Sequence, residues 1–261
     1  MGWFSDIPDW FRLRRRLAEP WRFLRDRKAR IDGTHYDVRL ADGRTVRLLS
    51  AQVDRQQLFS IFGRDEYRVN GLEPLGTVVD IGSHVGVFAL RIAPLAQRIV
   101  CYEPEPTNHA LLVENLRALP NVSVHRKAVS AGRGRATLHV SSVPDSHSMH
   151  AGTLAGTAVS SVEVETVGLA DVFAENGVER CDLLKVDAEG AEYDIVYSAP
   201  ADLWARVERV AMEYHDVPGG RPEWSGRRLA DYLQGAGHRV ELAPRRRHPL
   251  KGLLFSRRIS G

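Results

Sequence analysis

The alternation of strand-like and helix-like segments after residue 76 is the feature that most limits the fold. Apolar and β-branched runs typical of strands are separated by segments with helical periodicity. This order predicts βαβ units and a mostly parallel sheet covered by helices on both faces. The predicted strands are 77–81, 98–103, 122–127, 136–141, 162–167, 182–187, 207–213, 238–242 and 252–256, and the predicted helices are 85–95, 107–118, 168–175, 190–198 and 226–235. Since no helix separates the last two strands, the sheet should end in an antiparallel hairpin.

The first 50 residues predict an extension ahead of this α/β domain, which we expect to occupy residues 51–261 and to begin with a helix over 52–65. Residues 34–50 alternate around Asp42-Gly43, a dipeptide typical of tight hairpin turns. A β-hairpin is therefore expected in the second half of the extension.

Residues 1–30 form a basic amphipathic segment. Apolar residues, three of them tryptophan, follow one helical face and arginines follow the other, with breaks expected at Pro8 and Pro20. We favour an arrangement in which the apolar stripe packs on the domain and the arginines face solvent. The alternative is a peripheral contact with an anionic membrane surface.

Composition sets the broad class. The chain has 261 residues, 43% of them hydrophobic, which is enough for a sizeable core, and a net charge of +3. Two cysteines, Cys101 and Cys181, lie in strand-like runs and predict buried thiols in a reducing compartment. No signal-peptide pattern and no apolar run of about 18 residues is seen. We expect a cytoplasmic protein without a nucleic-acid partner.

The stretch "TVVDIGSHVGVFAL", residues 77–90, joins a strand, a glycine turn and a helix start. Ligands of open α/β sheets bind beyond the carboxyl ends of the strands, where Asp80 ends the first strand. Gly82 should let the backbone turn and approach a ligand, and Gly86 should let the next helix pack against the strand. A dinucleotide fingerprint needs glycines where Asp80 and Val85 stand, so pyrophosphate binding is poorly supported. An aspartate there suits a ligand with an ammonium group, such as S-adenosylmethionine.

Glu103, in "VCYEPEP", follows the glycine turn by about 20 residues, where an acidic residue can accept hydrogen bonds from both ribose hydroxyls. Ala128 and Val129 end the third strand and could border an adenine ring. The alternatives are a solvated strand end for Glu103 and ordinary core positions for the two apolar residues.

A second acidic group follows two later strands. "LLKVDAEGAEYDIV" contains Asp187, Glu189 and Glu192, and "VAMEYHDV" contains Glu213 and His215. If the strands are neighbours, these groups converge and suit a ligand ammonium, a metal, or acid–base work. Glu189 and Glu192 could instead be helix N-terminal acids.

Three further observations complete the candidate site. Lys185 lies in an otherwise apolar strand and must be paired; Glu213 or Glu189 are the candidate partners. His147 and His150, in the loop 142–160, match no closed metal pattern and are assigned to a lid or substrate loop. Arg246 belongs to "RRRH", which could attract an acidic substrate or be a solvated turn.

Together, "VVDIGSHVGVFAL", "YEPEP", "NVSVHRKAVS", "LLKVDAEGAEYDIV" and "MEYH" resemble, in this order, the FkbM family of S-adenosylmethionine-dependent methyltransferases over roughly residues 52–258. The resemblance implies a Rossmann-like, doubly wound class I methyltransferase sheet of seven strands and methyl transfer to oxygen. Members of the family act on hydroxyls of sugars, glycolipids and polyketide-type products. Ser83 and His84 stand where the family usually has Ala-Asn.

The predicted cofactor is S-adenosylmethionine, held by Asp80, Gly82, Ser83, His84, Gly86, Glu103, Ala128 and Asp187. The predicted catalytic residues are His215, Asp187 and Glu213, with His215 as general base, and the predicted substrate contacts are Glu189, His147, His150 and Arg246. No metal ligand is assigned.

We therefore expect an O-methyltransferase acting on a small-molecule or glycan hydroxyl. One alternative keeps the fold and uses Mg²⁺ at the acidic group. The other is a non-catalytic, membrane-docked binding module.

Overall fold

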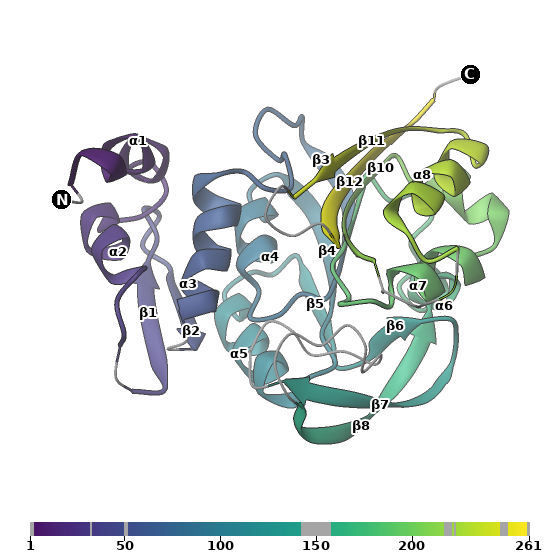
Figure 1. Ribbon diagram of the computed structural model, residues 1–261, viewed down its shortest axis with the longest axis horizontal. Coiled ribbons are helices and arrows are strands. Elements are labelled where there is room, and N and C mark those ends of the chain that lie inside the picture. Colours follow the sequence, from purple (N-terminus) through teal and green to yellow (C-terminus); the bar gives the residue numbers. More distant parts are fainter. Residues whose placement is uncertain are drawn as a thin grey trace.

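The computed structural model describes residues 3–31, 33–49, 52–141, 158–216, 221, 223–245 and 250–259 (Figure 1). Its centre is a seven-stranded sheet in the order β11-β12-β10-β9-β3-β4-β5. The strands are β3 (Leu75–Ile81), β4 (Ala96–Tyr102), β5 (Val122–His125), β9 (Leu183–Val186), β10 (Arg209–His215), β11 (His238–Pro244) and β12 (Lys251–Arg258). β12 runs in the opposite direction to the other six strands, and it therefore pairs antiparallel with both β11 and β10. The predicted α/β class, the seven strands and the antiparallel final hairpin are confirmed.

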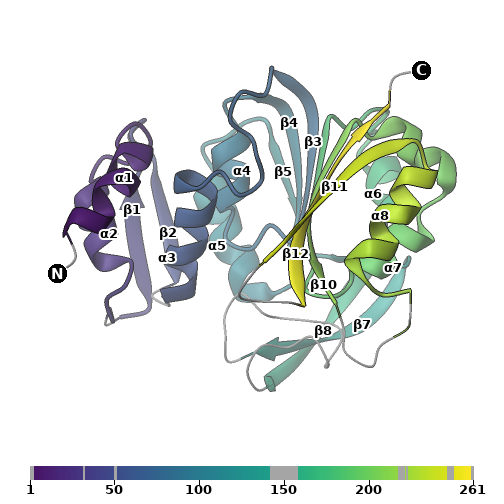
Figure 2. The ribbon, with the colours of Figure 1, turned by 45° about the horizontal axis from the view of Figure 1, so that its top comes forward.

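Helices cover both faces of this sheet (Figure 2). Successive strand residues point to opposite faces, so Val78 enters one core and Val79 the other. The first core is closed by α3 (Gln52–Leu58), a π-helical turn (Phe59–Gly63), α4 (Val87–Ile92) and α5 (Pro106–Leu116). The second is closed by α6 (Leu169–Glu175), α7 (Glu192–Ser198), a 3-10 helix (Ala201–Arg206) and α8 (Gly226–Gly235). Burial on both faces explains why the strands read as continuous apolar runs.

A separate three-stranded sheet accounts for two of the predicted strands. It has the order β6-β8-β7 and contains β6 (Ala128–Ser130), β7 (Gly134–Ser141) and β8 (Ala158–Gly168). The segments 136–141 and 162–167 therefore do not join the main sheet. Because no helix pattern separates them, they pair antiparallel with each other. The segment 122–127 ends its strand at His125 and the chain resumes as β6.

The extension packs directly onto the α/β unit. It contains α1 (Trp3–Leu13), α2 (Pro20–Asp26), β1 (His35–Arg39) and β2 (Thr45–Leu49), and the last two form the predicted hairpin. Pro20 begins α2, but α1 continues through Pro8, where we expected a break. A proline removes one backbone donor, and the rest of the turn holds this helix together. Leu13 and Phe23 are buried in the first core, which therefore continues across the boundary expected at residue 50.

Two further sequence features are seen directly. Cys101 and Cys181 are free and buried. Among the described helices, none has the length and apolar character needed to span a bilayer.

Candidate active site

The glycine turn after β3 is shaped by its contact with the end of β9. Gly82 has φ +71°, and a Cβ there would lie 1.8 Å from the carbonyl oxygen of Asp187. The glycine is thus required by a neighbouring strand, not only by a ligand as we expected. Gly86, with φ +89°, has a similar role towards α5, because a Cβ would lie 2.8 Å from Leu112 Cδ1. It packs α4 on α5, whereas we predicted packing on the strand.

Asp80 and Lys185 form a buried ion pair beneath this turn. Lys185 Nζ lies 3.2 Å from Asp80 Oδ1 and donates to the carbonyl oxygens of Ile81 and Gly82 at 3.3 and 2.6 Å. Asp80, not the predicted Glu213 or Glu189, is therefore the partner of this lysine. Burial raises the pKa of the Asp80 carboxyl despite the lysine, and the charges of Asp80 and Asp187 outweigh burial to raise the pKa of Lys185. The pair holds the turn in place.

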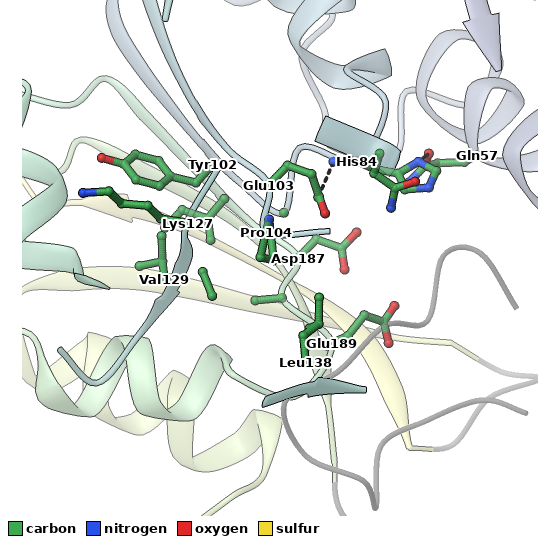
Figure 3. Close-up of a pocket in the computed structure, with 15 residues that line it drawn as sticks. Gln57, His84, Tyr102, Glu103, Pro104, Lys127, Val129, Leu138, Asp187 and Glu189 are labelled. Carbon is green, nitrogen blue, oxygen red and sulfur yellow. Dashed lines mark hydrogen bonds between the residues drawn. The ribbon is translucent and has the colours of Figure 1, made fainter. Parts of the chain in front are cut away.

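A cavity opens beyond the carboxyl ends of β3, β4 and β9, the expected ligand position in an α/β sheet (Figure 3). The empty space, counted together with the solvent at its open mouth, is about 660 Å³. Its walls are formed by Gln57, Ile81, Gly82, His84, Tyr102, Glu103, Pro104, Asn108, Lys127, Ala128, Val129, Leu138, Asp187, Ala188 and Glu189.

Six predicted site residues line this cavity: Gly82, His84, Glu103, Ala128, Asp187 and Glu189. Five others lie behind its walls, namely Asp80, Ser83, Gly86, Glu213 and His215. Asp80, predicted to contact the cofactor ammonium, faces Lys185 instead, and the Ser83 hydroxyl donates to the Asp80 carbonyl oxygen at 2.9 Å. His147, His150 and Arg246 lie outside the described residues.

Glu103 is held by two backbone donors. Its Oε2 accepts from the His84 N–H at 2.9 Å and its Oε1 accepts from the Glu105 N–H at 3.0 Å (Figure 3). Burial raises the pKa of this carboxyl to about 7, against the opposing effect of the two backbone hydrogen bonds. Each oxygen can accept a further hydrogen bond. A carboxylate in this position suits a vicinal diol such as a ribose.

His84 links the glycine turn to α3. Its Nδ1 lies 2.9 Å from Gln57 Oε1, and its backbone has φ +50°, which is uncommon for a residue with a side chain (Figure 3). Glu189, on the other side of the cavity, has φ +47°. Such conformations concentrate at functional sites. The sequence offered no sign of Gln57, because it lies 27 residues before His84 in a helix without a motif.

One wall of the cavity is apolar. Ala128 and Val129 from β6, Leu138 from β7 and Pro104 after β4 form it. It can receive a flat ring. The predicted positions Ala128 and Val129 belong to this wall, whereas Leu138 was missed because the small sheet was not foreseen.

Asp187 lines the cavity and has one oxygen without a hydrogen bond. Its Oδ2 accepts from the Tyr67 hydroxyl at 3.0 Å, while its buried Oδ1 accepts no hydrogen bond from the described residues. Burial alone would raise the pKa of this carboxyl, but the positive charges of Lys185 and His215 hold it below its usual range. This favours the ionised form of Asp187.

His215 is surrounded by carboxylates. Its Nδ1 lies 3.0 Å from Glu192 Oε1, and its Nε2 lies 3.3 Å from Glu189 Oε2 and 3.7 Å from Glu213 Oε1. Burial would lower the pKa of the imidazole, but the charges of Glu192 and Glu189 raise it well above its usual value. The ring is thus an imidazolium at neutral pH, and this disfavours the general-base role that we predicted for it.

Glu213 titrates differently from Asp187. Burial and the charge of Asp187 raise its pKa to about 8, although Arg245 Nη2 lies 2.8 Å from its Oε2. The same guanidinium nitrogen lies 2.6 Å from Glu66, a residue that the sequence gave no reason to select.

Glu192, a member of the second acidic group for which a helix N-terminal role was left open, shapes the loop after β9. Its two oxygens accept the backbone N–H groups of Ala188 and Gly190 at 3.0 and 2.9 Å. One donor atom each from Asp187, Glu192 and His215 lie within 4.8 Å of one another. Among the described residues, this group has the composition of a divalent-cation site.

Comparisons with known proteins identify the family. The model of the methyltransferase FkbM domain matches residues 80–240. The chain is 28% identical over 208 residues to methyltransferase sdnD of Sordaria araneosa, covering 66% of this chain and 80% of that protein. It is 29% identical over 235 residues to the 31-O-demethyl-FK506 methyltransferase FkbM of Streptomyces tacrolimicus, covering 78% and 88%.

A solved structure has the same architecture. The crystal structure of a methyltransferase FkbM from Methylobacillus flagellatus KT matches with a TM-score of 0.51 and 15% identity, over 72% of this chain and 46% of that one. This likeness supports the fold. Because the family model covers more than half of the sequence, the chain belongs to the FkbM family and is a methyltransferase.

Proposed function

We propose that this enzyme transfers the methyl group of S-adenosylmethionine to a hydroxyl oxygen of a sugar, a glycolipid or a natural-product-type small molecule. The observation that carries the proposal is Glu103. Its carboxylate is oriented by two backbone N–H groups beside a cavity at the carboxyl end of β4. The similarity to an enzyme whose name specifies O-methylation supports transfer to oxygen.

The lining residues fit this cofactor. Glu103 would accept the ribose hydroxyls, and Ala128, Val129 and Leu138 would border the adenine. Asp187 Oδ1, buried and without a partner among the described residues, would accept the ammonium group or the acceptor hydroxyl. When bound, the sulfonium supplies an electrophilic methyl carbon.

The protein's remaining tasks are alignment and removal of one proton. Alignment of two reacting groups can contribute several kcal/mol to catalysis, so a weak base with a low pKa can serve. Asp187 is the described catalytic candidate that both lines the cavity and has an oxygen without a hydrogen bond, and we assign to it the removal of the proton from the acceptor hydroxyl. His215 is then a positioning residue, since its imidazolium holds Glu189 and Glu192 in place.

Mass spectrometry tests the proposal. The purified enzyme should add the mass of one CH₂ group to a member of a panel of hydroxylated glycans and small metabolites, and E103A should not. A panel that stays unmodified, together with no binding of S-adenosylhomocysteine, would contradict it.

Metal assistance is the second candidate, because Asp187, Glu192 and His215 can converge on one ion. A bound cation would lower the pKa of the acceptor hydroxyl. However, both oxygens of Glu192 already accept backbone N–H groups, so we rank this second. Activity that survives exhaustive EDTA treatment would exclude it, and loss restored by Mg²⁺ would establish it.

A further inference from the structure

The N-terminal helices carry an exposed surface that the proposed chemistry does not use. α1 and α2 lie at one end of the molecule, beyond the β1–β2 hairpin and far from α8 (Figures 1 and 2). Ile7, Phe11 and Trp21 on these helices are 39%, 56% and 42% exposed. The other large apolar side chains exposed in the described part of the chain, Val113, Leu250 and Ile259, lie on separate elements. The N-terminal helices thus concentrate exposed apolar surface.

These side chains form one continuous patch. Trp10 stacks on Trp21 with ring centroids 5.8 Å apart, and it contacts Phe11 edge-on at 5.0 Å. Ile7 lies four residues before Phe11 and therefore on the same helix face. We call Ile7, Trp10, Phe11 and Trp21 the aromatic patch.

The exposed part of the aromatic patch lies outside the face that anchors the helices. Leu13, Leu17, Phe23 and Leu24 form that anchoring face and are at most 2% exposed, and Trp10 also packs against the same core. The exposed side chains Ile7, Phe11 and Trp21 are therefore not needed to bury the helices' inner face. A contiguous exposed apolar area on a folded protein usually marks an interaction site.

The segment that carries the aromatic patch has an excess of positive charge, with Arg12, Arg22, Arg25 and Lys28 paired to acids of the same segment. Residues 1–30 contain nine Lys or Arg and four Asp or Glu, although the whole chain has a net charge of only +3. The Arg14 guanidinium lies 5.7 Å from the Trp10 ring and 5.1 Å from the Phe11 ring. The exposed basic residues are Arg12, Arg14, Arg15, Arg22, Arg25, Lys28 and Arg30, against one exposed acid, Glu19, among the described residues of this segment.

We propose that this surface docks the enzyme on an anionic lipid bilayer. Aromatic side chains suit the boundary between headgroups and acyl chains, and the surrounding cations suit acidic headgroups. A second copy of the chain is a poorer occupant, because a symmetric pairing would bring two sets of seven exposed cations together. The proposal is independent of the methyl-transfer reaction.

Co-sedimentation of the full chain with vesicles tests this docking. The vesicles are phosphatidylcholine with phosphatidylserine, and phosphatidylcholine alone. F11S should weaken partitioning onto the acidic vesicles about tenfold, given the area of a phenylalanine ring. R15E/R25E should weaken it by more than fivefold per position, since each basic residue near the surface contributes about fivefold and a reversal also adds repulsion.

Matched variants on the α/β unit serve as controls. Ile259 is 56% exposed, like Phe11, and the Arg228 side chain is 65% exposed. I259S and R228E should leave partitioning unchanged, and circular dichroism should show all four variants folded. Raised salt should release the wild-type protein from the acidic vesicles.

Three results would overturn the proposal. The protein does not partition onto acidic vesicles, or it partitions equally onto acidic and neutral vesicles, or the control variants lose as much partitioning as F11S and R15E/R25E. A dimer that light scattering detects and F11S dissociates, without vesicle binding, would assign the aromatic patch to a second copy instead.

Discussion

The two ends of the cavity are built in different ways. At the glycine turn, backbone groups make the contacts: the His84 N–H donates to Glu103 19 residues later, and Gly82 leaves room for the Asp187 carbonyl. At the acidic end, Asp187 is held by Tyr67 from 120 residues away and Glu189 by Lys251 from 62 residues away. One end is therefore fixed mainly by backbone contacts, whereas the other is a network of side-chain charges.

This difference has a functional consequence. The backbone contacts of the turn leave little room for added atoms, so the turn should tolerate few substitutions. Its shape should change little with pH, although Glu103 beside it has a pKa raised to about 7. Buried charges depend on one another for their protonation states, so the acidic end should tolerate isosteric changes but respond to pH.

Substitution of Gly82 should have the largest effect and would test the backbone contacts of the glycine turn. In G82A the Cβ would lie 1.8 Å from the Asp187 carbonyl oxygen, so the turn and the end of β9 cannot both keep their positions. We expect a loss of about 4 kcal/mol or more in the free energy of unfolding, measured by urea denaturation.

The matched control is Gly177, which has φ +58° and nothing within 4 Å of its Cβ position. G177A should cost only about 1–2 kcal/mol, the penalty of a left-handed alanine. Equal losses for G82A and G177A would show that the close approach to β9 is not what requires Gly82.

Asp187 should give the next largest effect, on turnover. D187N keeps the shape but removes the charge, and we expect kcat to fall roughly 100-fold, as for loss of a proton acceptor. E213Q, an isosteric change behind the cavity wall, should cost less than tenfold. If E213Q is the more damaging variant, the proton acceptor is Glu213.

His215 should control how stability depends on pH. Its pKa is raised in the folded state, so its contribution to stability is complete below its unfolded pKa of about 6.5 and is lost as the pH rises through the folded value. The free energy of unfolding should fall more steeply with pH in the wild type than in H215Q, by up to about 1.4 kcal/mol per pH unit. Parallel curves would show that the ring is not charged.

The smallest effect should be the pH dependence that Glu103 imposes on cofactor affinity. The Glu103 pKa of about 7 means that protonation removes hydrogen-bond acceptors as the pH falls. The dissociation constant for S-adenosylhomocysteine should rise below about pH 7 by up to tenfold per unit, and E103Q should abolish this dependence. Calorimetry at a series of pH values would measure it, and identical profiles in the two proteins would contradict it.

The sequence predicted which residues meet at the glycine-turn end of the cavity. Asp80, Gly82 and Glu103 follow strands whose apolar runs identify them, and positions at neighbouring strand ends must meet. The sequence did not reveal which group each of these residues contacts. Gly82 makes room for Asp187, and Asp80 faces Lys185, because those details depend on β9, some 100 residues later.

The sequence predicted which residues gather at the acidic end, but it did not predict what each of them does. Asp187, Glu189, Glu213 and His215 do converge. The protonation of His215 depends on Glu192 beside it, and the partners Tyr67, Arg245 and Glu66 come from segments without a motif. The small sheet was missed for a similar reason, since a strand's length and apolarity do not identify its pairing partner.

Calorimetric titration with S-adenosylhomocysteine measures whether Glu103 binds the ribose. The wild type should bind this compound, E103Q should bind it roughly 100-fold more weakly through loss of charge-assisted hydrogen bonds, and an analogue without the ribose hydroxyls should no longer distinguish the two proteins. Equal affinity of the wild type and E103Q for the intact compound would show that Glu103 does not hold the ribose.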